Sequence, residues 1–125
     1  MNKEFVYVCH MFGNDIVGNS KKINEICRDI AINENKIPLA PYLHFIQFLD
    51  DKNQNERDLG LGYNFNIIEA LRQDIEFRIC GEDSVLTDGM RKEIEKAMEL
   101  GLEINYKCSK TLEDAVKEFI KSLKK

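Results

Sequence analysis

Residues 5–20 read FVYVCHMFGNDIVGNS: five apolar residues, a loop with two glycines, and the approach to a helix. A continuous run of β-forming residues such as Phe5–Cys9 is typical of a strand that is buried on both faces. Apolar residues then recur at steps of three and four over residues 23–31, which predicts an amphipathic helix capped by Asn19 or Ser20. This part of the chain is therefore expected to form a strand, a loop and a helix.

The same order recurs along the chain. Further strands are expected at residues 37–41, 75–80 and 102–106, and further helices over residues 59–71, 88–100 and 112–123. This alternation predicts a three-layer α/β fold of flavodoxin/Rossmann-like type, with an open, mostly parallel sheet of four to five strands and helices on both faces. Residues 1–125 are expected to form one domain. Ligands of such sheets bind at the carboxyl ends of the strands, so the loops after Cys9, Ala40 and Cys80 are the candidate site.

Composition narrows the possible partners. The 125 residues carry a formal net charge of −4, which argues against a nucleic-acid polymer bound through a broad basic face. No apolar run approaches the roughly 18 residues of a membrane span, and the start of the chain lacks the apolar core of a signal peptide. The four scattered cysteines have no zinc-binding spacing and indicate free thiols in a reducing compartment. We expect a cytoplasmic protein without a metal or cofactor.

Residues 13–20, GNDIVGNS, have the glycine spacing of a Walker A loop but not its lysine, because Asn19 stands in that position. This excludes a P-loop NTPase. A loop of small residues before a helix, including Gly13, still offers free amides to an anion or a sugar hydroxyl. The alternative is an ordinary connection between a strand and a helix.

The expected helix 88–100 contains one glutamate that faces inward. At about 100° per residue, Glu93 falls about 60° from Met90, at the margin of the apolar face, whereas Glu95 and Glu99 point away from it. An inward carboxylate at the mouth of a parallel sheet suits a nucleophile or a general base. Glu93 could instead cap its own helix or pair with a neighbouring lysine.

Aromatic residues and one histidine offer a further candidate surface. His44 lies among Tyr42, Phe45 and Phe48, where it could donate a hydrogen bond to a base stacked on an aromatic ring. These residues could equally cover one end of the sheet. Cys9 beside a histidine could act as a nucleophile, but adjacent residues of a strand point to opposite faces, which favours a buried structural thiol.

Several segments together resemble a known family. They are the strand VYVC, the helix-opening Asn19, the segment IPLAPYLHFIQFLDD at residues 37–51 and the helix start TDGMRKEIEKA at residues 87–97. They resemble small, mostly uncharacterised bacterial and phage proteins related to the nucleoside 2-deoxyribosyltransferases. The resemblance covers residues 5–106.

Deoxyribosyltransferases carry a D-x-G-T-x-x-E-x-G-x-A pattern, in which the glutamate attacks the anomeric carbon of the sugar. On this chain Gly89 matches the first glycine, Glu93 the nucleophile and Ala97 the alanine. Thr87 replaces the aspartate, Met90 the threonine and Glu95 the second glycine. The aspartate of the preceding helix is absent, and Asn64 and Asn66 occupy its neighbourhood, which supplies hydrogen bonds but no acid or base. The resemblance also implies a homo-oligomer.

These observations predict a protein that acts on a nucleoside or nucleotide at its N-glycosidic bond, as a hydrolase or a deoxyribosyltransferase. Glu93 is the expected catalytic nucleophile. The expected substrate-binding residues are Phe12, Gly13, Asn19, His44, Asp88, Gly89 and Met90. The alternative is a non-catalytic module that binds a nucleotide or an ADP-ribose-like metabolite, with a phage as one possible source.

Overall fold

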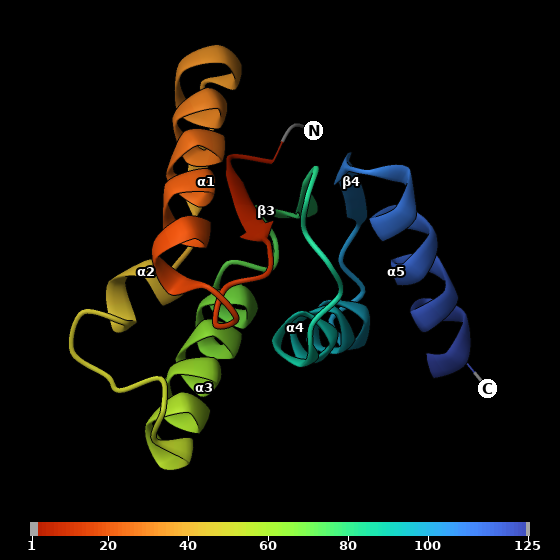
Figure 1. The fold of residues 1–125 in the computed structure, drawn as a ribbon. Helices are drawn as coiled ribbons and strands as arrows, with labels where there is room; N and C mark the ends of the chain where they lie inside the picture. Colours follow the sequence, from red (N-terminus) through yellow and green to blue (C-terminus); the bar gives the residue numbers. More distant parts are fainter. Residues whose placement is uncertain (1–2, 125) are drawn as a thin grey trace.

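The computed structural model describes residues 3–124 as an α/β fold (Figure 1). Its elements are, in chain order, β1 (Phe5–Cys9), α1 (Ile16–Asp29), the π-helical turn η1 (Ile30–Glu34), β2 (Ile37–Leu39), α2 (Tyr42–Phe45), α3 (Gln54–Ala70), β3 (Ile75–Gly81), α4 (Asp88–Glu99), β4 (Ile104–Cys108) and α5 (Lys110–Leu123). The predicted alternation of strands and helices is confirmed.

The four strands form one parallel sheet in the order β2-β1-β3-β4. The chain leaves β1 toward one edge of the sheet to form β2 and then crosses back to form β3. The order of connection therefore reverses between β1 and β3, whose pairing runs from Phe5 opposite Ile75 to Cys9 opposite Ile79. Parallel sheets bind ligands in the crevice at this reversal, outside the carboxyl ends of the strands.

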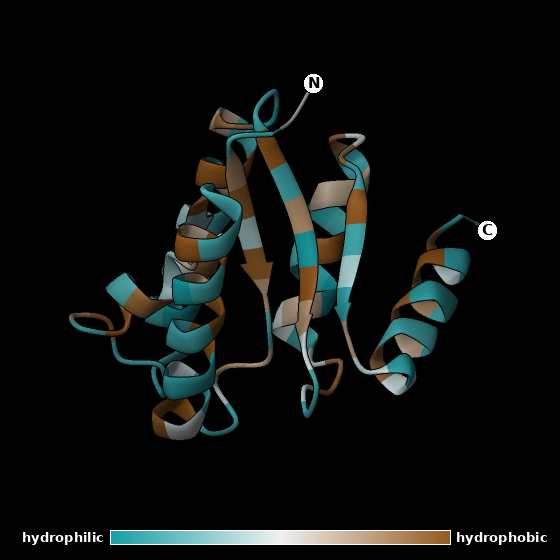
Figure 2. Ribbon diagram, turned by 90° about the horizontal axis from the view of Figure 1, so that it is seen from above, coloured by the Kyte–Doolittle hydropathy of each residue, from teal (hydrophilic) through white to brown (hydrophobic). Residues whose placement is uncertain are grey.

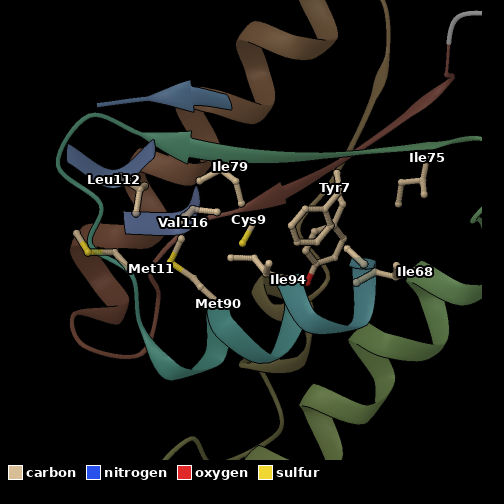
Figure 3. Packing of buried hydrophobic residues seen from close by; sticks show 12 residues of the cluster. Tyr7, Cys9, Met11, Ile68, Ile75, Ile79, Met90, Ile94, Leu112 and Val116 are labelled. Carbon is tan, nitrogen blue, oxygen red and sulfur yellow. The ribbon is translucent and has the colours of Figure 1, made fainter. Parts of the chain in front are cut away.

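Alternate residues of the central strands face two different apolar clusters. The larger cluster joins Tyr7, Cys9, Phe77 and Ile79 of the sheet to α3, α4 and α5. Figure 3 shows how Tyr7, Cys9 and Ile79 meet Ile94 and Met90 of α4. On the opposite face, Val6, Val8 and Cys80 pack against α1 and η1. Helices thus pack against both faces, with α1 and α5 at opposite ends of the sheet (Figure 1).

The face of β3 that points away from the larger cluster also carries charge. Figure 2 shows hydrophobic and hydrophilic residues alternating along this strand, even though all seven of its residues are buried. Arg78 donates to Glu76 at 2.6 Å and to Glu34 of η1 at 2.8 Å, and Lys36 lies 3.3 Å from Glu76. Buried charges need partners of this kind, so the network explains how a central strand holds two ionised side chains.

The start of α1 differs from the sequence prediction, and one short helix was not predicted. α1 begins at Ile16, because the Asp15 carboxylate caps it by accepting a hydrogen bond from the Gly18 amide at 3.2 Å. The predicted cap at Asn19 or Ser20 is therefore wrong, since both residues lie inside the helix. Residues 42–45 form the short helix α2.

Sequence spacing predicts an apolar stripe of Leu59, Tyr63, Ile67 and Leu71 on α3, and the first half of this stripe is wrong, whereas Leu71 packs against the larger cluster. Leu59 and Tyr63 are exposed, and the buried positions are Asn64 and Ile68. This helix contains two glycines, and its polar and apolar residues are not clearly separated on two faces. Its sequence therefore does not define which face points inward. The consequence is that an asparagine, not an apolar residue, faces inward.

None of the helices within residues 3–124 is both long and apolar enough to cross a membrane.

Candidate functional site

A cavity of about 460 Å³ opens at the carboxyl edge of the sheet, beside the reversal between β1 and β3. Its wall is formed by the segment after β1, by α2 and the loop that follows it, by α3 and by the first turns of α4. The volume lies within the range of small-molecule sites, about 300–1,000 Å³. Of the predicted site residues, the cavity brings together Phe12, Gly13, Asp88, Gly89, Met90 and Glu93.

Glu93 lies in the buried part of this cavity. The helical position that the sequence predicted turns its side chain toward the sheet, and only 5% of the residue is exposed. The hydroxyl group of Tyr7 on β1 donates a short hydrogen bond to Glu93 Oε2, and Cys9 Sγ lies 3.7 Å from Oε1. Because Tyr7 and Cys9 are two residues apart on one strand, they present both donors on the same face.

The surroundings of Glu93 change its acidity. Burial raises the pKa of the Glu93 carboxyl group to about 7, and the hydrogen bonds from Tyr7 and Cys9 act in the opposite direction. Burial and the nearby Glu93 raise the pKa of Tyr7 and that of Cys9 well above their ordinary values. Tyr7 and Cys9 are therefore protonated donors at neutral pH, and the structure does not support a Cys9 thiolate nucleophile. A carboxyl group that titrates near pH 7 suits catalysis in the physiological range.

Two aromatic residues line the cavity next to the strand ends. The rings of Phe12 and Tyr42 lie 5.0 Å apart, and Tyr42 donates its hydroxyl proton to the carbonyl oxygen of Val8 at 2.6 Å. This bond ties α2 to β1 and fixes the ring of Tyr42. The two rings are tilted by 54° to each other, so either ring, but not both together, can stack against a planar ligand ring.

Asn19 supports the loop after β1 and does not line the cavity. Its side-chain amide donates to the carbonyl oxygen of Phe12 at 3.1 Å and to Asn14 Oδ1 at 2.9 Å. A loop that contains Gly13 needs such fixed points to hold one conformation. The structure therefore gives Asn19 a positioning role, where sequence predicted a contact with the substrate.

His44 also lies outside the cavity lining. It is exposed on α2, with its ring 5.2 Å from that of Phe48 and 5.7 Å from that of Phe45. The four-residue helix turns His44 outward while Tyr42 and Phe45 face the cavity. The predicted contact between His44 and a base is not formed by this arrangement.

The start of α4 forms the opposite side of the cavity. Thr87 caps the helix by accepting a hydrogen bond from the Met90 amide at 3.3 Å. Asp88 is exposed at the rim and pairs with Arg91 at 3.3 Å. Met90 is buried in the core cluster and contributes to the inner wall. Gly89 leaves open space, because a Cβ atom built there would meet nothing within 4 Å.

Tyr7 and His10 are site residues that the sequence predictions missed, and Asn64 was noted only as a neighbour of the absent aspartate and not as a substrate-binding residue. Asn64 is only 5% exposed, and its Oδ1 has no hydrogen-bond partner within the described residues. His10 is buried, and its Nδ1 donates to the carbonyl oxygen of Met11 at 2.7 Å. Tyr7 could have been found because it lies two residues before Cys9 and therefore on the same face of the strand. Asn64 could have been found because it lies four residues before Ile68 and therefore on the same face of the helix.

The rim of the cavity is acidic. Arg57 and Lys92 are the two cationic side chains among its described lining residues. Five carboxyl groups lie toward the rim, those of Asp50, Asp51, Glu56, Asp58 and Asp88, and a sixth, that of Glu93, is buried below them. Nowhere in residues 3–124 do three or more histidine, cysteine, aspartate or glutamate side chains gather as they would around a metal ion.

Residues 4–107 match the family described as domain of unknown function DUF7768. The chain belongs to this family. The match includes every element that lines the cavity. No curated protein and no solved structure matches the DUF7768 chain. Its function therefore has to be argued from the site.

Proposed function

We propose that the chain is a nucleoside- or nucleotide-processing enzyme of nucleoside 2-deoxyribosyltransferase-like fold that acts at an N-glycosidic bond. The observation that carries the proposal is the buried carboxyl group of Glu93, held by Tyr7 inside a cavity of about 460 Å³ at the reversal of strand order. Helical position and the resemblance to the family pattern both point to this same glutamate.

In the proposed reaction, ionised Glu93 attacks the anomeric carbon of the sugar. The bond between that carbon and the base nitrogen breaks, and the sugar is held as an ester of Glu93. Water or a second base then takes the sugar and releases the carboxylate. Tyr7 positions the nucleophile, because its hydroxyl group donates to one carboxyl oxygen while the other faces Cys9. The ring of Phe12 or that of Tyr42 offers a face on which the base stacks.

Binding of the sugar needs polar groups near Glu93. Asn64 has an amide oxygen free to accept a hydrogen bond from a hydroxyl group. The backbone around Gly13 and Gly89 leaves room for a ligand to approach closely. The proposal includes a homo-oligomer, as the family resemblance implies, and light scattering on the purified protein would measure its mass.

The test is chromatographic detection of free base after incubation with nucleosides, deoxynucleosides, nucleotides and NAD. Wild type is compared with Glu93→Gln, which keeps an acceptor for Tyr7 but removes the nucleophile. Glu95→Gln, a change on the exposed side of the same helix, is the matched control. We expect release by wild type and Glu95→Gln only. A substrate analogue with fluorine at C2′ should leave the sugar attached to Glu93, which mass spectrometry of the intact protein would detect.

The second candidate is a non-catalytic module that binds a nucleotide or an ADP-ribose-like metabolite. The raised pKa of Glu93 favours this function, because a protonated carboxyl group donates a hydrogen bond to a ligand but does not attack it. Ligand-dependent thermal stabilisation without base release from any compound would support the module. It would also refute the enzymatic proposal for that panel.

A further inference from the structure

The buried part of the cavity contains one carboxyl group and one amide. Of the described residues that line it, Glu93 is the one buried carboxyl group, and the other five carboxyl groups are exposed or half-buried toward the rim. Asn64 is the buried amide, and its Oδ1 lacks a partner. A side chain that is nineteen-twentieths buried with an unused acceptor points to a ligand that supplies the missing hydrogen bond.

Cleavage of an ordinary N-glycosidic bond needs two groups, because the departing base leaves with an extra electron pair. One carboxylate attacks the sugar, and a second acid usually gives a proton to the leaving group. Glu93 cannot do both in one step, since it attacks only when it is ionised. Asn64 has no acidic proton to give.

The other buried proton donors of the cavity are already used within the protein. Tyr7 donates to Glu93, and Tyr42 donates to the carbonyl oxygen of Val8. The Nδ1 proton of His10 is donated to the carbonyl oxygen of Met11, and burial lowers the pKa of its imidazole, so the ring is neutral. No buried acid among these residues is free to protonate a leaving base.

The charge of the rim favours a particular kind of base. The five carboxyl groups toward the rim outnumber the two cationic lining side chains. Two of the five are paired, Asp51 with Arg57 at 3.8 Å and Asp88 with Arg91 at 3.3 Å. An opening with an excess of carboxylates concentrates cations and repels anions. The cavity has no free buried acid, and its rim is negatively charged. Both features favour a ligand whose base is positively charged.

We propose that the substrate is a nucleoside whose base carries a fixed positive charge, such as a pyridinium or an N7-alkylated purinium nucleoside. This inference rests on the proposed function and specifies its substrate. A bond forms between a Glu93 oxygen and C1′, and the bond between C1′ and the ring nitrogen breaks. Its electron pair passes to that ring, which becomes neutral, so the base leaves without receiving a proton. The oxygen of water then forms a bond to C1′, and the bond between C1′ and the Glu93 oxygen breaks. Its electron pair restores the Glu93 carboxylate, and water releases one proton to the solvent.

The first experiment compares kcat/KM for matched cationic and neutral nucleosides. Nicotinamide riboside is compared with uridine, and 7-methylguanosine with guanosine, as ribosides and as 2′-deoxyribosides. Each rate is corrected for the rate with Glu93→Gln, which removes the intrinsic lability of the cationic compounds. Because a general acid contributes about 100-fold or more, we expect a preference of at least about 100-fold for the cationic member of each pair. Comparable values for both members would overturn the inference.

The second experiment restores an acid at the position of the unpartnered amide. Asn64→Asp should raise kcat/KM for guanosine and uridine by about tenfold or more and leave the cationic substrates without a gain. Asn66→Asp, on the exposed side of the same helix, is the matched control and should change neither value. An unchanged preference in a folded Asn64→Asp protein would overturn the inference. If that variant does not fold, the inference is decided by the first experiment, the ratio of kcat/KM for cationic and neutral nucleosides with wild type.

The two proposals fail in different ways. Cleavage of neutral and cationic nucleosides at similar rates would leave the glycosidic function standing and remove the inference about charge. No cleavage of any nucleoside by wild type would refute both. The KM for nicotinamide riboside should also rise with ionic strength while the KM for a neutral substrate stays constant, because salt screens the acidic rim. Equal salt dependence for both would count against the role of the rim.

Discussion

Glu93 makes the stability of the protein depend on pH in a way that needs no ligand to measure. Its pKa is about 7 in the folded chain against an ordinary value of 4.5. Below about pH 4.5 the carboxyl group is protonated in both the folded and the unfolded chain. As pH rises toward 7, the unfolded chain releases the proton while the folded chain keeps it, so stability is lost. At about 1.4 kcal/mol per pKa unit, the loss totals about 3 kcal/mol and then stops.

Glu93→Gln removes this titration and keeps the shape of the side chain. We expect the difference in unfolding free energy between Glu93→Gln and wild type to grow by about 3 kcal/mol, in favour of the variant, from pH 4.5 to 7.5. Urea unfolding followed by circular dichroism at steps of one pH unit measures it. Contributions from other ionisable groups, such as the network around Arg78, are common to both proteins and cancel in the difference.

Glu95→Gln is the control, because Glu95 is exposed on the same helix and its difference from wild type should be independent of pH. The reasoning would be refuted if the difference for Glu93→Gln were equally constant. That result would mean that Glu93 is ionised in the folded protein at pH 5, against the burial that raises its pKa.

Three further changes test the contacts around the site and the sheet. Tyr7→Phe removes a donor to ionised Glu93, worth about 1.5–3 kcal/mol, so the pH range of the stability loss should extend upward by about one to two units; an unmoved range would exclude this hydrogen bond. Gly81→Ala should cost about 1–3 kcal/mol in urea unfolding, since its φ is +107° and its Cβ would lie 2.6 Å from His10 Nε2; an unchanged midpoint would contradict that geometry. Arg78→Met should cost about 3–5 kcal/mol at neutral pH, because it leaves Glu34 without its arginine and Glu76 with Lys36 alone, and recovery of stability near pH 4 would identify these two carboxylates as the cause.

The sheet was predictable because its signals are local. The apolar run Phe5–Cys9 and the alternating residues of β3 each identify a strand, and the alternation of strands with helices requires parallel pairing. The burial of Glu76 and Arg78 in β3 was not predictable in this way, because it depends on ion pairs with other segments. The start of α1 was less predictable. Asp15 competes with Asn19 and Ser20 as a cap, and only the backbone before the helix decides among them.

The site was predictable only in part. Glu93 follows from helical geometry within α4, so its inward position could be derived from spacing alone. Its contact with Tyr7 joins residues 86 positions apart and depends on the register between β1 and α4. Asn64 was hidden by the incorrect stripe of α3, since the more apolar Leu59 and Tyr63 suggested the opposite face. The contact between Tyr7 and Glu93 and the inward position of Asn64 depend on how distant elements pack, so they could not be predicted from local sequence patterns.

The energetic cost of Glu93 supports a functional role for it. A position this deep in a core of Tyr7, Met90 and Ile94 would be filled at lower cost by an apolar residue or by glutamine. The two donors that face Glu93 reduce the cost of burying its charge but leave the pKa near 7, so the folded chain is destabilised at neutral pH by about 3 kcal/mol. Asn64 adds a second unfavourable feature in the same cavity, an acceptor without a donor. Proteins hold such local conflicts at functional sites, where the conflict serves a ligand, and the coincidence of both within one cavity favours a site over a structural defect.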